Sequence, residues 1–347
     1  MEKAQVEAAM RILKEQKQLL QQHPTRQQNT LIPDDNMEDI LVNLPVSCSL
    51  PGLVERADLD HNVEPKKLDW PFMESKSAFT YLKLYSCTDG ILCMEWYDGK
   101  KVSMFLWNPR INKYKMLPIL YSFEKRQPFI GSLEYVGFGY GSSINDFKVV
   151  RVFLQLFRFS PAPQFIMQEL NVKSNVWRSV HEDAPYTIDI IPIKPVHKDG
   201  VLYFVAKRLT SISSRQISII LRFDLADESL QEVAMPPIVT WDGFDLPLFL
   251  EVLGGSLHLG YGMGLWVMKE EACWVKFLDF KGIFDKFMRP LCFTEAGALI
   301  LTNLVPGKFH IYHTENDTCR EFEVCRDASF RGVISYSDSL ISPSYDD

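Results

Sequence analysis

The sequence predicts an all-β fold, with a β-propeller-like domain of repeated four-stranded blades preceded by short N-terminal helices. From about residue 80 to residue 342, short β-rich runs alternate with Asp-Gly, Gly-Gly and Asn-Pro turns, and no long helical pattern intervenes. Two short sequence elements also recur along this stretch. A single four-stranded blade cannot bury both of its faces, so such repeats must pack on one another. We therefore predict one β domain over residues 81–343.

Residues 1–30 predict one amphipathic helix. They are rich in Gln, Lys and Glu, and apolar residues recur near a 3.6-residue period until Pro24 interrupts it. The apolar stripe is thin and broken by Lys17. This favours an exposed, partly frayed helix over one paired with another helix, and a disordered extension is the alternative.

Residues 31–56 form a second segment, which begins with a predicted shorter helix between Pro33 and Pro45. Asp34 and Asp35 follow Pro33 and can cap free amide groups at its start, and Pro45 ends it. One face of this helix carries Met37, Ile40, Leu41 and Leu44. Because this helix is short and its face is strongly apolar, we expect the face to pack on a partner surface. Residues 57–80 are interpreted as a linker and lead-in to the β domain.

The two recurrent elements give the period of the β domain. The first is a turn leading into an apolar strand, seen at Asp89–Leu92, Asp199–Leu202, Gly254–Leu257 and Ala296–Leu299. The second is an apolar strand followed by a polar turn, and its copies begin at Phe105, Glu169, Leu221, Leu265 and Phe309, about 44 to 64 residues apart. This spacing is typical of propeller blades. Residues 333–341 are a candidate strand to complete the first blade, and an open sandwich of the same strands remains the alternative.

The composition bounds the partners and the compartment. The net charge of −7 disfavours nucleic acid, which requires a concentrated basic face. No run approaches the roughly 20 apolar residues of a membrane span, and the first residues lack the apolar stretch of a secretory signal. We expect a cytoplasmic or nuclear protein without a membrane partner. Seven cysteines without C-x-x-C spacing predict reduced thiols rather than disulfides or a zinc site.

The sequence predicts no catalytic, metal or cofactor site. The seven histidines form no H-E-x-x-H motif, and His310 and His313 would point to opposite faces of a strand. The glycine-rich runs 137–141 and 260–264 lack phosphate-loop spacing and are interpreted as turns at strand ends. No G-x-S-x-G motif occurs. Acidic residues such as Asp224, Asp227 and Glu228 are expected to lie in solvated turns.

The aromatic residues suggest where recognition occurs. Four tryptophans recur near corresponding strand positions and are expected to pack between blades: Trp107, Trp177, Trp266 and Trp274. Trp241 and Phe244 instead lie in a predicted loop, residues 236–247. Exposed aromatic residues on loops of a rigid scaffold are typical of protein-binding hot spots. We therefore predict that these two residues bind a target protein.

Two parts of the chain resemble a known family. Residues 31–46 resemble the opening of an F-box, with an Ile40–Leu41 pair and a Leu-Pro-Val exit that ends at Val46. Residues from about 84 to 342 resemble the F-box-associated domain of plant F-box proteins, including the S-locus type. The motifs that carry this second resemblance are Ser86–Cys93, Leu106–Pro109, Val136–Tyr140, Asp146–Val150, Asn175–Arg178, Phe223–Glu228, Leu265–Glu270 and Ser339–Pro343.

The resemblance implies a substrate-recognition subunit of an SCF-type (cullin-RING) E3 ubiquitin ligase, without an activity of its own. The F-box would dock on a Skp-type adaptor bound to a cullin scaffold, and the β domain would hold an unidentified target protein. The implied adaptor-facing residues are Ile32, Pro33, Ile40, Leu41, Leu44 and Pro45. The chain departs from the F-box pattern after Leu50, where the third helix is missing. The alternatives are an adaptor-independent interaction module that has lost a functional F-box, and a propeller hydrolase or lyase with polar groups on a central axis.

Overall fold

The structure is a computed structural model, and every regular element in its described part is a β-strand. It describes residues 38–43, 52–54, 66–67, 81–97, 102–118, 129–157, 164–182, 184–188, 193–208, 217–236, 249–261, 264–279, 288–294, 297–302, 308–323 and 332–345. The chain forms two compact units. Unit 1 comprises residues 1–69 and 236–340, and unit 2 comprises residues 70–235 and 341–347.

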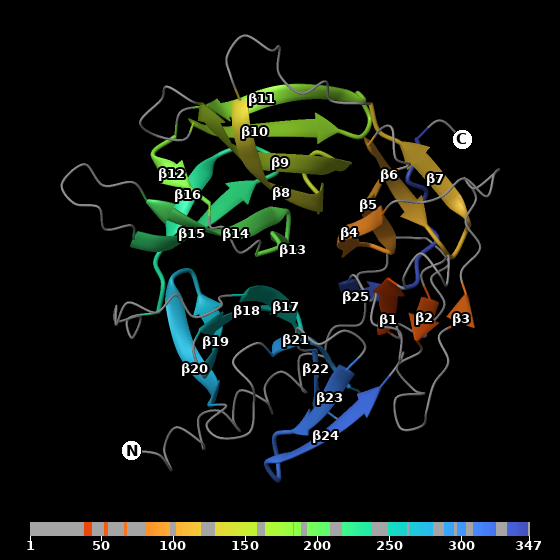
Figure 1. Ribbon diagram of the computed structural model, residues 1–347, viewed down its shortest axis with the longest axis vertical. Coiled ribbons are helices and arrows are strands. Elements are labelled where there is room, and N and C mark those ends of the chain that lie inside the picture. Colours follow the sequence, from red (N-terminus) through yellow and green to blue (C-terminus); the bar gives the residue numbers. More distant parts are fainter. Residues whose placement is uncertain are drawn as a thin grey trace. The chain divides into compact units, whose positions relative to one another are not determined.

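Unit 2 contains three antiparallel sheets, named B, C and D here, whose strands are labelled in Figure 1. Sheet B comprises β4 (Tyr81–Thr88), β5 (Ile91–Tyr97), β6 (Val102–Asn108) and β7 (Lys113–Met116). Sheet C comprises β8 (Phe129–Gly141), β9 (Asp146–Phe157), β10 (Gln164–Asn171) and β11 (Val176–Glu182). Sheet D comprises β12 (Tyr186–Thr187), β13 (Val196–Lys198), β14 (Val201–Arg208), β15 (Ile217–Asp224) and β16 (Leu230–Val233).

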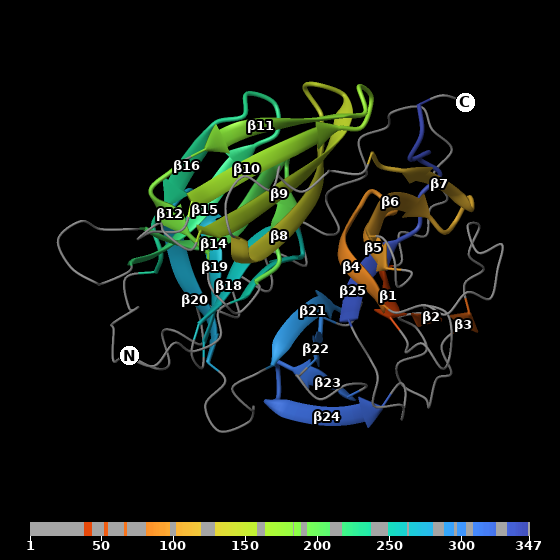
Figure 2. The same ribbon diagram turned by 45° about the horizontal axis from the view of Figure 1, so that its top comes forward.

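Unit 1 contains the other three sheets, A, E and F. Sheet E comprises β17 (Phe249–Leu253), β18 (Ser256–Tyr261), β19 (Gly264–Glu270) and β20 (Cys273–Asp279). Sheet F comprises β21 (Arg289–Phe293), β22 (Leu299–Thr302), β23 (Lys308–His313) and β24 (Thr318–Glu323). Sheet A has the order β25 (Gly332–Ser337), β1 (Glu38–Asn43), β2 (Gly52–Val54) and β3 (Lys66–Lys67) (Figure 2).

The predicted repeat is confirmed strand by strand in sheets B to F. Each described turn of the first element leads into β5, β14, β18 or β22, and the five copies of the second element are β6, β10, β15, β19 and β23. At Asp89-Gly90 both turn residues have positive φ angles, 49° and 70°, as a tight type I′ hairpin requires. Asp199-Gly200 repeats this geometry with angles of 51° and 78°. The turn chemistry in the sequence therefore sets the hairpins directly.

The predicted helix at residues 33–44 is wrong where the structure describes it. Residues Glu38–Asn43 form β1, which pairs with β25 on one side and with β2 on the other. Ile40 lies opposite Ser335, and Leu41 lies opposite Ile334. The short apolar run Ile40–Val42 fits a buried strand as well as one helix face, and pairing with the distant β25 decides between them. The expected late strand is confirmed as β25, but it belongs to sheet A, where it pairs with β1, rather than to sheet B. The helix predicted over residues 1–30 lies outside the described residues.

The sheets of each unit pack on apolar faces. In unit 2, one cluster joins sheets B and C through Leu106, Phe138, Val149 and Leu170. A second joins sheets C and D through Val150, Phe165, Leu202, Phe204 and Leu221. In unit 1, Val267, Phe277, Leu299 and Leu301 join sheets E and F. Because successive strand residues alternate between the two faces, a middle sheet such as C buries apolar residues on both.

One glycine-rich run is strand rather than turn. Residues 137–141 were predicted to form a turn at a strand end, but they are the last part of β8. A Cβ atom at Gly139 would lie 2.3 Å from Cδ2 of His197 in sheet D. This glycine is therefore required because the neighbouring sheet approaches the backbone of β8 closely.

Candidate target-recognition loops

The connections between strands differ at the two ends of sheets B to F. At one end, here called the turn end, the hairpins are short and comprise residues 89–90, 109–112, 142–145, 172–175, 199–200, 225–229, 254–255, 271–272, 294–298 and 314–317. At the other end, the loop end, the connections vary in length and comprise residues 98–101, 117–128, 158–163, 183–185, 209–216, 234–248, 262–263, 280–288, 303–307 and 324–331. In a four-stranded antiparallel sheet, the second and fourth strands run in the same direction and end on the same side. The connections that follow these two strands therefore leave the sheet at the same end. Every variable connection of a unit's sheet therefore starts from the loop end of that sheet.

Backbone geometry restricts the hairpins of the turn end. Every non-glycine residue with a positive φ angle in the described part of the chain lies in a turn-end hairpin: Asp89, Asn112, Asn145, Asn175, Asp199, Glu228, Ala272 and Asp317. Left-handed positions restrict both the length and the residue types of a turn. The described turn-end hairpins are therefore constrained in length and residue type by their backbone geometry.

The predicted target-binding residues belong to the loop end. Trp241 and Phe244 lie in the connection between β16 and β17, residues 234–248, which is the longest loop-end connection by these strand bounds. Both residues lie outside the described residues, so their role stays a prediction. The strands that flank this connection are described, and β16 and β17 belong to different units.

The structure describes only two of the six residues that are implied to face an adaptor. Ile40 and Leu41 lie in β1, inside sheet A. Ile32, Pro33, Leu44 and Pro45 lie outside the described residues. The backbone groups of β1 form its ladders with β2 and β25, so this segment is part of the β domain rather than a separate helical module.

A buried cluster of charges, which the sequence did not indicate, joins sheets C and D at their turn ends. The Lys148 ammonium lies 3.1 Å from both carboxylate oxygens of Glu169 and 2.9 Å from Oε1 of Glu228. Arg178 forms ion pairs with the same two glutamates. The side chains of Lys148 and Glu169 are 2% and 0% exposed, so neither charge is compensated by water. We call Lys148, Glu169, Arg178 and Glu228 the charge clamp.

The charge clamp contains two cations and two carboxylates, and these neighbours act on the pKa values of both glutamates. Burial raises the pKa of Glu169, although its hydrogen bond with Lys148 and the charge of that lysine oppose the shift. Burial also acts to raise the pKa of Glu228, but hydrogen bonds from Arg178 and Lys148 outweigh it and leave that pKa lowered. These ion pairs link sheet C to sheet D. Glu228 was expected to be a solvated turn residue, and this expectation is wrong because its side chain returns to Lys148.

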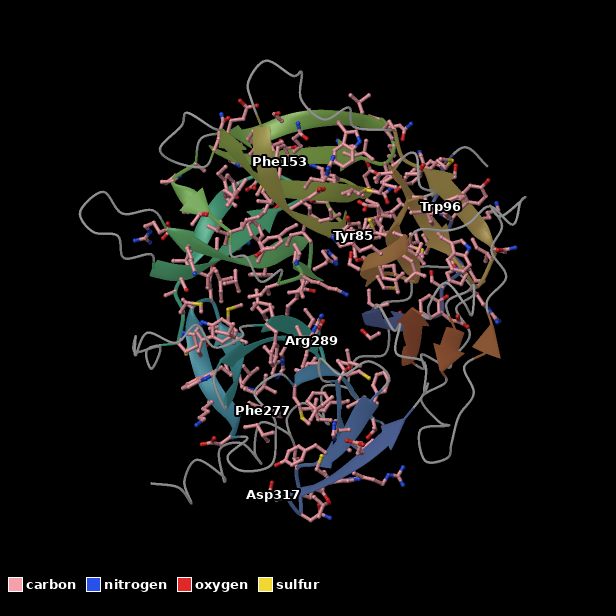
Figure 3. All side chains as sticks on the ribbon, viewed as in Figure 1. Tyr85, Trp96, Phe153, Phe277, Arg289 and Asp317 are labelled. Carbon is pink, nitrogen blue, oxygen red and sulfur yellow. The ribbon has the colours of Figure 1, made fainter. Side chains whose placement is uncertain are left out.

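A second buried polar pair lies within sheet B (Figure 3). The hydroxyl of Tyr85 donates a 2.6 Å hydrogen bond to Oε2 of Glu95, and both side chains are buried. Burial, followed by the charge of Glu95 and this hydrogen bond, raises the pKa of Tyr85. The phenol therefore stays protonated and cannot serve as a base at neutral pH.

Cys319, His310 and Glu321 resemble a nucleophilic triad in residue type only. The Cys319 sulfur lies 3.8 Å from Nδ1 of His310, and Nε2 of His310 lies 3.8 Å from Glu321. Burial, and then the charge of Glu321, raise the pKa of the thiol, whereas a nucleophilic cysteine requires a lowered pKa. His310 and His313 do face opposite sides of β23, as predicted. The described residues contain no group of three potential metal ligands.

In the described residues, strands joined by short turn-end hairpins leave connections of differing length at the loop end, and the charge clamp and the Tyr85–Glu95 pair are each paired internally. A family model described as the F-box associated beta propeller domain matches residues 42–343. The chain belongs to this family. The match begins within β1, in agreement with the incorporation of that strand into sheet A.

Two relatives from Arabidopsis thaliana carry names that agree with this family. An F-box/kelch-repeat protein is 25% identical over 280 residues, which cover 76% of this chain and 70% of that protein. An F-box/LRR-repeat/kelch-repeat protein is 30% identical over 169 residues, which cover 46% of this chain and 41% of that protein. The resemblance to plant F-box proteins is therefore confirmed.

Solved structures support the fold of this F-box associated domain. TolB from Acinetobacter baumannii matches 88% of this chain and 68% of its own, with a TM-score of 0.50 and 10% identity. Hydrazine synthase from Kuenenia stuttgartiensis matches 90% of this chain and 48% of its own, with a TM-score of 0.50 and 8% identity. At such low identities the similarity concerns the fold alone. No helix in the described residues is long and apolar enough to span a membrane.

Proposed function

We propose that this F-box associated domain is the target-recognition part of a substrate receptor for a cullin-RING ubiquitin ligase. The domain binds a target protein through its loop-end connections and contributes no bond-making chemistry of its own. It acts in the cytoplasm or the nucleus, where the ligase subunits would be available. Family membership and the F-box names of both relatives support the proposal.

The observation that carries the proposal is the separation of fixed turns from variable connections. Binding loops are commonly placed where a rigid scaffold tolerates changes in length and sequence. The charge clamp and the apolar clusters fix the strands, so a change in a loop-end connection leaves the sheets intact. Trp241 and Phe244 place two aromatic side chains in such a connection, and aromatic residues are the usual anchors of protein interfaces.

The recognition half can be tested by changing the loop and the scaffold separately. Proximity labelling in plant cells with the full chain identifies proteins that bind it, and purified candidates then give a Kd. Trp241→Ala with Phe244→Ala is expected to weaken target binding at least about tenfold, since hot-spot residues each contribute on the order of 2 kcal/mol. The matched control is Val176→Ala at the turn end, where the side chain is 61% exposed. Equal affinities for both variants would contradict the role of this loop.

The proposed adaptor contact is a separate question. A Skp-type adaptor is the expected partner of an F-box protein, and the implied docking residues include Ile40 and Leu41. Helical docking through these residues would break the six-residue pairing of β1 with β25. This favours a second candidate function, a protein-interaction module that works without an adaptor.

Two lengths of the chain distinguish these functions. The full chain and a chain beginning at Glu38 are each mixed with a purified plant Skp-type adaptor, after far-UV circular dichroism shows that both are folded. Binding by the full chain alone supports adaptor docking through residues before β1. Target binding by both chains without adaptor binding by either supports the adaptor-independent module. Adaptor binding by both chains would show that the β domain itself docks the adaptor.

A further inference from the structure

The C-terminal segment Ile341–Tyr345 lies at the turn ends of sheets B and C. It continues from β25, yet it belongs to unit 2 rather than to the unit of that strand. In the described part of the chain, no strand contains these residues, and their backbone joins no sheet ladder. Side-chain groups of two sheets hold the segment instead, which is how a protein holds a bound peptide.

The first anchor is the buried amide of Asn108, which is 0% exposed. Its Nδ2 donates a 2.8 Å hydrogen bond to the carbonyl oxygen of Ile341. Its Oδ1 accepts a 2.9 Å hydrogen bond from the backbone N–H of Arg110, which fixes the orientation of the amide. A buried amide oriented in this way recognises the backbone of an extended segment and is indifferent to the side chain at that position.

The second anchor recognises the tyrosine. The Lys173 ammonium lies 4.9 Å from the centroid of the Tyr345 ring, within cation–π distance. Asp146, which is 5% exposed, accepts hydrogen bonds from the backbone N–H of Lys173. Burial, followed by the charge of Asp146 and a hydrogen bond to it, raises the pKa of the Tyr345 phenol. The hydroxyl therefore remains a donor that the Asp146 carboxylate accepts.

The segment between these anchors is only partly embedded. The side chains of Ile341 and Tyr345 are 43% and 41% exposed, whereas Pro343 is buried. The backbone N–H of Ser344 donates to Oγ of Ser342, a local turn that the segment carries with it. Because the segment lies outside the sheet ladders and the side chains at both of its ends are partly exposed, it can leave without opening the apolar clusters.

We propose that Asn108, Asp146 and Lys173 form a peptide-binding site that the chain's own C-terminal segment occupies. We call these three residues the tail site. Its ligand class is an extended peptide with a tyrosine four residues after a carbonyl that Asn108 binds, with proline between them. The site lies at the turn ends of sheets B and C, opposite the loop-end connections of those sheets, and is independent of target recognition there. The covalently attached segment has a millimolar or higher effective concentration, so it blocks free peptides until it is displaced.

The test uses a fluorescent peptide of residues 338–347 and two lengths of protein. A chain ending at Leu340 is expected to bind the peptide saturably, at least about tenfold more tightly than the full chain, whose site is occupied. Asp146→Asn in the shortened chain, or phenylalanine in place of tyrosine in the peptide, is expected to weaken binding at least about fivefold, since each removes one charge-assisted hydrogen bond. Asp227→Asn, in an exposed turn of sheet D, is the matched control and is expected to have no effect.

Two results would overturn the proposal. One is a folded shortened chain that does not bind the peptide at millimolar concentration. The other is equal binding by the shortened and full chains, which would place the peptide elsewhere. If the shortened chain does not fold, hydrogen exchange in the full chain decides. Excess peptide is expected to speed amide exchange at Ile341 to Tyr345 through competition, and unchanged exchange would make the segment a fixed part of the fold.

Discussion

The charge clamp gives the most direct test of how sheets C and D are held together. Replacing Lys148 with Met keeps most of the side-chain volume but removes the buried cation of the charge clamp. Glu169 then keeps a carboxylate at 0% exposure with only Arg178 as a partner, and Arg178 is itself 48% exposed. Breaking a buried ion pair from one side costs about 3 to 5 kcal/mol. Because Arg178 retains part of the compensation, we expect the free energy of unfolding at pH 7.5 to fall by about 3 kcal/mol.

Two further features of the Lys148→Met variant identify the cause. Without the opposing effect of the lysine, the folded-state pKa of Glu169 rises further above its unfolded value, so folding takes up a proton as the pH falls. The loss of stability is therefore expected to be smaller at pH 5.5 than at pH 7.5. Adding Glu169→Gln removes the unpaired charge and is expected to restore at least about half of the loss.

Urea unfolding followed by far-UV circular dichroism measures these changes. Lys276→Met is the control, because its ion pair with Asp279 is about one-third exposed on both sides and is expected to change stability by less than about 0.5 kcal/mol. Two results would refute the view that removing Lys148 leaves an uncompensated buried carboxylate at Glu169. One is a loss below about 1 kcal/mol for Lys148→Met, and the other is a double variant no more stable than the single one.

Three other outcomes are expected. Burial lowers the pKa of His258 to about 4, so its contribution to stability is complete above pH 6.5 and is lost towards pH 4. A pH series of urea unfolding should show that His258→Leu loses about 3 kcal/mol of this acid dependence. Gly139→Ala should cost about 1 to 3 kcal/mol in thermal unfolding. Gly264→Ala, whose closest neighbour at 3.1 Å is the flexible end of Lys276, should cost less than about 1 kcal/mol. A chain ending before Gly332 leaves β1 without β25; hydrogen exchange of sheet A should then rise to the level of an open loop, and retained protection would contradict the pairing.

The sequence predicted what is decided locally. Asp89-Gly90 and Asp199-Gly200 specify their own hairpins, so the order of strands in sheets B to F follows from turns and short apolar runs. The run at Glu38–Asn43 misled because its pattern fits one helix face, and only its partner at Gly332–Ser337, nearly 300 residues away, makes it a strand. No local pattern contains that information.

The polar sites were harder to predict for the same reason. Lys148 and Glu169 lie on neighbouring strands, and Glu228 belongs to the next sheet, so their spacing in the chain gives no signal. Lys148 does stand in a strand of valines and phenylalanine, where an unpaired ammonium would be costly, and this was the one available clue. The location of the candidate recognition loop follows from the repeat, whereas its target depends on side chains whose binding the fold does not determine.

The pairing of β1 with β25 has a consequence for synthesis. The ribosome makes β1 within the first 43 residues but completes its partner only at Ser337. At about 5 to 20 residues per second, the growing chain exposes one edge of β1 for roughly 15 to 60 seconds. During this interval an unpaired strand edge is open to other nascent chains. We expect the yield of folded protein to depend on chaperones that shield this edge until β25 has been made, more than on the speed at which the remaining sheets form.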